Sequence, residues 1–111
     1  MNVLPVKHQD IYAVWDRVEP FIIEGLKYQT DYTAGDVRVY LAEGIWSLMV
    51  VVDGSAQPIG AIVVKYYNRP KDRVAFVVAI GGVRISTQEG FDSFRTLLKY
   101  NGVTKVEGAA R

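Results

Sequence analysis

The sequence predicts a mixed α+β domain with a mainly antiparallel sheet and helices on both faces. Two observations support this prediction. Hydrophobic residues make up 50% of the 111-residue chain and charged residues 23%, which is ordinary for one globular domain spanning residues 1–111. The stretch from Ile45 to Gly102 is typical of three successive strands followed by an amphipathic helix, expected at Trp46–Val52, Ile59–Tyr67, Arg73–Ile80 and Gln88–Tyr100.

Composition excludes several classes of function. Thirteen basic and twelve acidic residues give a net charge of +1, so neither nucleic acid nor an anionic membrane is an expected partner. The chain has no cysteine and only one histidine, His8, which removes thiolate chemistry and argues against a metal site or a Ser-His-Asp triad. The longest apolar runs have the length of strands and no secretory signal is recognisable, so the cytoplasm is the expected compartment.

The N-terminal part of the chain is expected to hold one strand and two helices. Asn2–Val6 suits an edge strand because Pro5 has no N–H. A helical spacing of apolar residues predicts a first helix over approximately Gln9–Arg17, with Trp15 in the core and His8 exposed at its start. Pro20 is expected to begin a second, short helix.

A third helix is predicted from Thr33 to Gly44, after a loop. Thr33 and Asp36 have the spacing of a capping box, and Gly44 suits a left-handed helix end. From Trp46, assigned to the core, the pattern changes to strands, joined by turns at residues 53–58 and 68–72.

The pair Gly81-Gly82 is interpreted as an opening where the third of these strands ends. Unpaired N–H groups there, together with the start of the helix over residues 88–100, would suit an anion or a phosphate-bearing cofactor. The alternative is a bulge or bend without a ligand. After this helix, a last strand over Val103–Val106 is expected to lie parallel to the strand that ends at the glycine pair.

This order of elements resembles the acyl-CoA-binding N-acetyltransferase superfamily known as GNAT, most closely the short GNAT-like proteins of tailed phages and some bacteria. The resemblance rests on the capped helix Thr33–Gly44, the hairpin over residues 46–67, the run of residues 78–82, the helix from Phe91 to Tyr100, and residues 103–111. It implies a GNAT-like sheet whose fourth and fifth strands splay apart. The usual C-terminal helix and strand are not found in this sequence.

The resemblance also implies that acetyl-CoA is the cofactor and where it would bind. The pantetheine arm would lie along the backbone at Ile80, Gly81, Gly82 and Val83. Arg84, Gln88 and Gly90 would correspond to the loop that holds the pyrophosphate. This loop departs from the family pattern, because Gly90 is its only glycine and Glu89 adds a negative charge.

The catalytic residues are left open. Acetyl transfer to an amine needs a base and an acid. Glu43, Asp53, Asp72 and Glu107 are candidate bases, of which Glu107 is expected nearest the splay, and a solvated strand-end carboxylate is the alternative for it. Tyr66, Tyr67 and Tyr100 could each donate a proton, but no acid is assigned.

Two functions therefore remain. The chain is either an acetyl-CoA-dependent N-acyltransferase, or a catalytically silent GNAT-like structural or interaction protein such as a phage virion component or a phage protein that binds a host factor. The missing final segment has three explanations: truncation, supply by another chain, or a protein that works without it. The last strand would expose a sheet edge, for which self-association or a protein partner is the expected cover.

Overall fold

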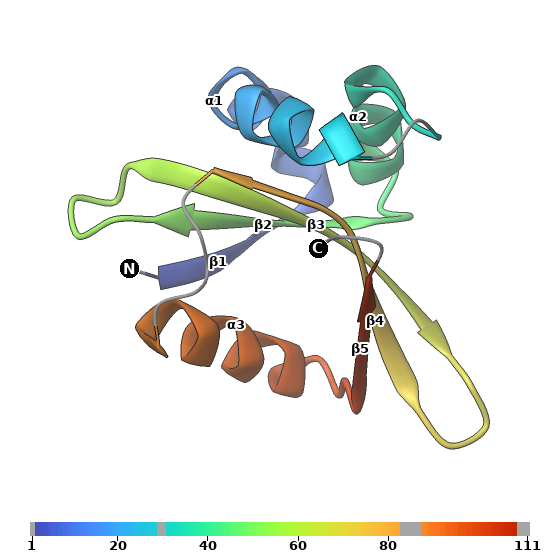
Figure 1. Ribbon diagram of the computed structural model, residues 1–111. Coiled ribbons are helices and arrows are strands. Elements are labelled where there is room, and N and C mark those ends of the chain that lie inside the picture. The colour runs from blue at the N-terminus through green and yellow to red at the C-terminus, as the bar shows by residue number, and fades with distance from the viewer. Residues whose placement is uncertain (1, 29–30, 83–87, 109–111) are drawn as a thin grey trace.

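The computed structural model describes residues 2–28, 31–82 and 88–108, which form a five-stranded sheet with three helices (Figure 1). The strands are β1 (Asn2–Val6), β2 (Ser47–Val52), β3 (Pro58–Asn68), β4 (Arg73–Gly82) and β5 (Lys105–Gly108). The helices are α1 (Ile11–Gly25), α2 (Ala34–Ala42) and α3 (Gln88–Tyr100), with short 3-10 turns at His8–Asp10 and Leu26–Tyr28. None of these helices is both long and apolar enough to cross a membrane.

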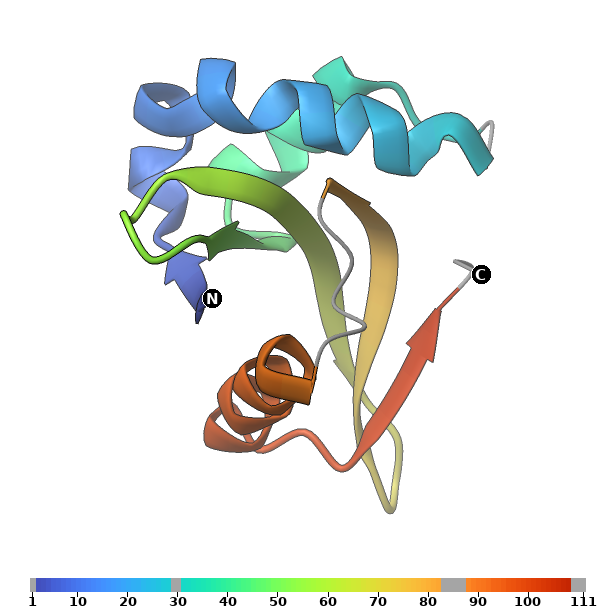
Figure 2. The ribbon, with the colours of Figure 1, turned by 60° about the vertical axis from the view of Figure 1, so that its left-hand side comes forward.

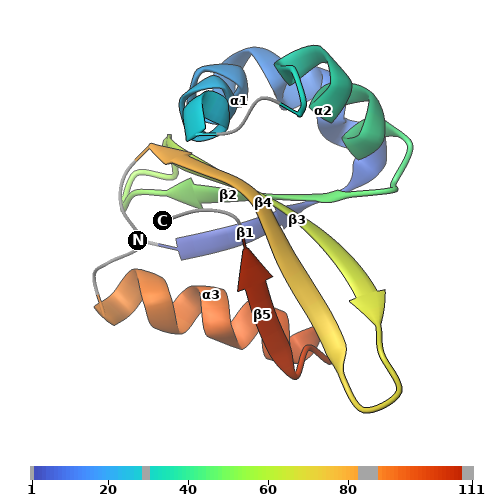
Figure 3. The same cartoon turned by 45° about the vertical axis from the view of Figure 1, so that its right-hand side comes forward.

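The strands lie in the order β1-β2-β3-β4-β5, with antiparallel pairing from β1 to β4 and a parallel pair β4-β5. α1 and α2 cover one face of the sheet and α3 covers the other (Figures 1 and 3). Each face of the sheet has its own hydrophobic cluster. Trp15 and Trp46 belong to the cluster beneath α1 and α2, and Phe94 and Leu98 belong to the cluster beneath α3. The predicted fold class and the placement of both tryptophans in the core are confirmed.

The capping box of α2 forms as the sequence predicts. The hydroxyl oxygen of Thr33 accepts the N–H of Asp36 at 3.1 Å, and the Asp36 carboxylate accepts the N–H of Thr33 at 3.0 Å. Gly44 follows the helix with a φ of +77°, the left-handed conformation that favours glycine.

One expectation for the N-terminal region is wrong. The two helices predicted over Gln9–Arg17 and from Pro20 are a single helix, α1, which contains Pro20. Val18 and Ile22 lie four residues apart and are both only 1% exposed, so burial of one continuous face outweighs the hydrogen bond that proline removes. Pro20 itself is exposed, so water can replace the hydrogen bond that its missing N–H would have made.

The last strand begins two residues later than expected. Residues 103–106 were the predicted strand, but β5 runs from Lys105 to Gly108, and its parallel pairing with β4 is confirmed. The N–H of Val103 still donates to the carbonyl of Leu98 at 3.0 Å, and the Val103 side chain packs against the cluster beneath α3. Val103 therefore closes the helix end before the strand starts.

Candidate functional site

β4 and β5 separate part of the way along the sheet. The register pairs Val74 with Lys105 and ends at Val77 with Gly108. Beyond this point β4 continues to Gly82 paired with β3, whereas its ladder with β5 has ended. Figure 2 shows β4 (yellow to orange) and β5 (red) diverging toward their C-terminal ends. The predicted splay between the fourth and fifth strands is confirmed.

The irregularity in β4 lies at Val78 and was not predicted. Val64 faces Val77 whereas Val63 faces Ala79, so Val78 is an extra residue in β4. Such a bulge bends a strand and increases its twist, and this one falls where β5 departs. The apolar run over residues 74–80 gave no sign of it, because a bulge changes the pairing and not the hydrophobicity.

Gly81 and Gly82 are not an opening, which corrects the sequence-based interpretation. Both residues belong to β4 and pair with Ala61 and Gly60 of β3. Both positions require glycine because the backbone of neighbouring elements lies too close for a side chain. A Cβ atom on Gly81 would lie 1.9 Å from the carbonyl oxygen of Phe21 in α1, and one on Gly82, where φ is +91°, would lie 2.5 Å from the Cα atom of Gly60.

Glu24 of α1 is a residue that the sequence analysis did not connect with this region. Its carboxylate accepts the backbone N–H of Gly82 at 3.1 Å. Fifty-eight residues separate the two in sequence, and only the passage of α1 over the end of β4 brings them together. A ligand seeking this N–H would have to compete with the carboxylate.

Five of the seven predicted cofactor residues lie in the part of the chain that the structure describes. Ile80, Gly81 and Gly82 are the last residues of β4, and Ile80 packs against the cluster beneath α3. Gln88 begins α3 and donates to Asp92 at 2.9 Å, while Gly90 is buried in the first turn. Val83 and Arg84 lie outside the described residues.

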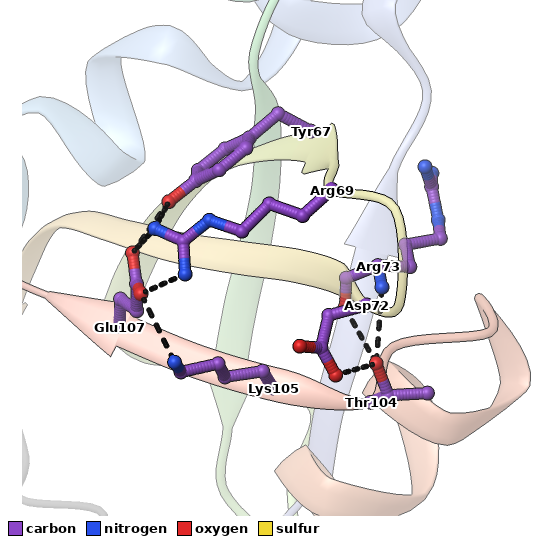
Figure 4. Close-up of polar contacts among 7 residues, drawn as sticks. All are labelled: Tyr67, Arg69, Asp72, Arg73, Thr104, Lys105 and Glu107. Carbon is purple, nitrogen blue, oxygen red and sulfur yellow. Dashed lines mark hydrogen bonds and ion pairs between the residues drawn. The ribbon is translucent and has the colours of Figure 1, made fainter.

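Glu107, the candidate base, belongs to a polar cluster between β5 and the β3–β4 hairpin (Figure 4). Tyr67 donates its hydroxyl to the Glu107 carboxylate at 2.5 Å, and Arg69 forms an ion pair with the same carboxylate at 3.0 Å. Lys105 approaches it at 3.7 Å. These contacts connect the hairpin to the last strand.

The cluster changes the acidity of its members. The hydrogen bond from Tyr67 and the charges of Arg69 and Lys105 lower the pKa of Glu107, while the hydrogen bond to Glu107 raises the pKa of Tyr67. A carboxylate with a lowered pKa is a weaker proton acceptor. The contacts therefore suit Glu107 better to binding a cation than to removing a proton.

We expect Glu107 to make stability depend on pH in the acid range. Because its pKa is lower in the folded chain than its ordinary value of 4.5, the stabilisation is present above that value and is lost as the pH falls through the folded-state pKa. Urea unfolding of the native chain and of Glu107→Gln should differ at pH 7 and converge in acid. A difference that stays constant down to pH 3 would contradict this role.

The other candidate bases have structural partners or lie apart. Asp53 accepts the N–H groups of Ser55 at 2.8 Å and Gln57 at 3.0 Å, and these bonds lower its pKa and shape the β2–β3 turn. Asp72 accepts the hydroxyl of Thr104 at 3.1 Å (Figure 4). Glu43 occupies the C-cap position of α2, where its backbone N–H donates to the carbonyl of Val39 at 3.0 Å.

The remaining candidate residues play no part in this cluster. The Arg73 guanidinium lies over the ring of Tyr66, 5.0 Å from the centre of that ring. Tyr100 is 87% exposed on α3. His8 is exposed, with Nδ1 3.3 Å from the carbonyl oxygen of Ala42. The described part of the chain shows no cluster of three or more histidine, aspartate or glutamate side chains that could hold a metal ion.

Comparison with solved structures identifies the fold. No protein-family model and no curated protein matches the sequence. A probable acetyltransferase is similar over 100% of this chain and 80% of its own, with a TM-score of 0.68 and 6% identity. A ribosomal-protein-alanine N-acetyltransferase from Brucella melitensis biovar Abortus gives a TM-score of 0.65 at 10% identity, covering 100% of this chain and 81% of its own.

A third neighbour is an aminoglycoside acetyltransferase from an uncultured soil metagenomic sample. It has a TM-score of 0.64 and 8% identity, and the match covers 99% of this chain and 77% of its own. Identities this low establish the architecture and leave the activity open. The chain has the fold of the GNAT acetyltransferases.

Proposed function

We propose that the chain binds acetyl-CoA or a related acyl-CoA along the side of β4 from which β5 separates, as an N-acyltransferase-type protein. The observation that carries the proposal is the splay of β4 from β5 beyond Val77, in a chain with the GNAT fold. Where β5 has separated from β4, the backbone of Ile80–Gly82 can offer hydrogen-bonding groups to an extended ligand that itself carries amides, as the pantetheine arm does.

The residues present fit this ligand in part. The backbone at Ile80, Gly81 and Gly82 would hold the pantetheine arm, followed by Val83. The start of α3 would face the diphosphate, with Arg84, Gln88 and Gly90 as the proposed contacts. The glycine pair is used for packing against α1 and β3, so the strand edge, not the absence of side chains, is the feature that suits the ligand.

Bound acetyl-CoA would supply an activated thioester to an acceptor amine. The chain would position the two groups, and Glu107, predicted above as a candidate base, is proposed instead to bind the acceptor amine. Its ion pair with Arg69 and its lowered pKa keep it ionised at neutral pH, so it would attract a protonated amine.

Acetyl-CoA is expected to raise the unfolding temperature of the purified chain. A ligand at about a hundred times its dissociation constant adds roughly 2.7 kcal/mol, and each kcal/mol raises the midpoint by about 4–8 °C in a domain near this size. Thermal unfolding followed by circular dichroism, with and without acetyl-CoA, measures the shift. The absence of any shift at millimolar acetyl-CoA would contradict the proposal.

A pair of charge variants on α3 gives the matched control. Gln88→Glu places a negative charge at the start of α3, where it should weaken diphosphate binding; the charge suits the helix start but removes the hydrogen bond from Gln88 to Asp92. Thr96→Glu makes the same change at an exposed position in the middle of the helix. Only the first should reduce the shift. Gly82→Val is not a useful variant, because a Cβ there would collide with β3 in the absence of any ligand.

The second candidate is a GNAT-fold protein without catalysis that serves as a structural or interaction protein, for example in a phage virion or against a host factor. The contact between Glu24 and the N–H of Gly82 favours it, since a carboxylate already lies at the end of β4. A partner on the outer edge of β5, a second copy or another protein, is proposed with either function.

A further inference from the structure

We propose that β5 pairs with β5 of a second copy of this chain, antiparallel and centred on Val106. The inference rests on the proposal above that a partner covers the edge of β5, and it names the partner and the register. It does not depend on acyl-CoA binding, so the two can fail separately.

The first argument is that the two edges of the sheet differ. On β1 the N–H of Val3 donates to the hydroxyl of Ser93 in α3 at 3.0 Å, so it points away from β2. Two residues later in the strand, the backbone nitrogen of Pro5 also points away from β2, and proline carries no N–H there. β1 is therefore closed to another strand by two separate features, and no described residue plays a similar part at β5.

The second argument is the direction of the peptide groups in β5. The N–H of Thr104 donates to the carbonyl of Arg73 at 2.9 Å, on the side of β4. Peptide groups alternate along a strand, so those of Lys105 and Glu107 point away from the sheet. In an antiparallel pair centred on Val106, Lys105 of each copy faces Glu107 of the other, and these are the residues that can exchange hydrogen bonds.

Charge selects the same register. Antiparallel pairing places the ammonium of Lys105 opposite the carboxylate of Glu107 twice, whereas parallel pairing would place like charges opposite each other. The Lys105 ammonium lies 3.7 Å from the Glu107 carboxylate of its own chain, which is a loose ion pair, and the Lys105 side chain is 49% exposed. It can therefore also contact a carboxylate of the second copy. Tyr67 and Arg69 contact the same Glu107 carboxylate from the side of β3 (Figure 4), so the outer edge of β5 is left to the backbone and to Lys105.

Val106 lies at the centre of the pair. Its side chain is 52% exposed in the single chain and would contact Val106 of the second copy across the two-fold axis. The pairing uses the β5 edge, which no residue in the described part of the chain covers, and leaves the closed β1 edges outside, so it stops at a dimer. A strand of four residues makes a small interface, and a weak dimer is expected.

Two charge reversals test the register. In a dimer of Lys105→Glu, a carboxylate at position 105 faces a carboxylate at position 107 twice, and in a dimer of Glu107→Lys two ammonium groups face each other twice. Each variant alone should therefore self-associate at least about tenfold more weakly than the native chain. An equimolar mixture restores opposite charges at both positions and should recover dimers. Sedimentation equilibrium over micromolar to millimolar concentrations measures all three.

The controls separate the register from general charge effects and from misfolding. Lys99→Glu and Asp16→Lys make the same charge changes at exposed positions on α3 and α1, and their mixture should behave like the native chain. Hydrogen exchange of the native chain needs no variant: protection at the amides of Lys105 and Glu107 should grow with protein concentration, while that of Lys71 in the hairpin turn should not change.

Three results would overturn the inference: a native chain that is monomeric at millimolar concentration, a dimer that is insensitive to both reversals, or amides of β5 whose exchange does not depend on concentration. The thermal shift with acetyl-CoA is measured independently, so a monomer that binds acetyl-CoA would reject the dimer alone. A dimer that does not bind it would reject the acyl-CoA proposal alone.

Discussion

Replacing Gly81 with alanine is expected to destabilise the fold by about 3 kcal/mol or more. The new Cβ atom would lie 1.9 Å from the carbonyl oxygen of Phe21 and 3.0 Å from the backbone nitrogen of Gly25. These are backbone atoms of α1, which cannot rotate away as a side chain would, so α1 must move off the sheet. We expect thermal unfolding at a midpoint at least about 10 °C lower.

Gly35→Ala is the matched control for this substitution. Its Cβ atom would meet nothing closer than the hydroxyl of Thr33 at 3.6 Å, and it lies in the first turn of α2. Alanine should be neutral or stabilise the chain by about 0.5–1 kcal/mol there. Equal midpoints for Gly81→Ala and the native chain would show that α1 does not lie against β4 as described.

Replacing Trp46 with alanine is expected to cost about 3–5 kcal/mol. Trp46 is 8% exposed and has its ring 4.9 Å from that of Tyr32 and 4.6 Å from that of Tyr40. Removing the indole leaves a cavity where α2 meets the start of β2 and takes away both aromatic contacts. Urea unfolding should show a lower midpoint with a similar slope.

Two further variants make the Trp46 result specific. Trp46→Phe keeps an aromatic ring in the cluster and should cost clearly less than the alanine variant. Tyr100→Ala removes an aromatic side chain that is 87% exposed, and it should change the free energy of unfolding by no more than about 0.5 kcal/mol. A small loss for Trp46→Ala would assign this residue to a surface and not to the core.

Local chemistry was sufficient to predict most of the elements. The capping box at Thr33, the turns between the strands and the helix over residues 88–100 depend on neighbouring residues, and each forms where it was expected. The parallel position of β5 was also predictable, since a strand, a helix and a strand joined by short connections leave few arrangements. The acetyltransferase fold follows from this order.

The sequence by itself thus determined the fold class, the order of the elements and the two-sided core, because periodicity and capping are properties of the local chain. Only the tertiary structure decided that α1 continues through Pro20, that β4 bulges at Val78 and that Gly81 and Gly82 are packing residues. It also brought Glu24 to the N–H of Gly82 and Tyr67 and Arg69 to Glu107. These features depend on contacts between residues distant in sequence, whose energies outweigh the local preferences of proline, glycine and a charged strand end.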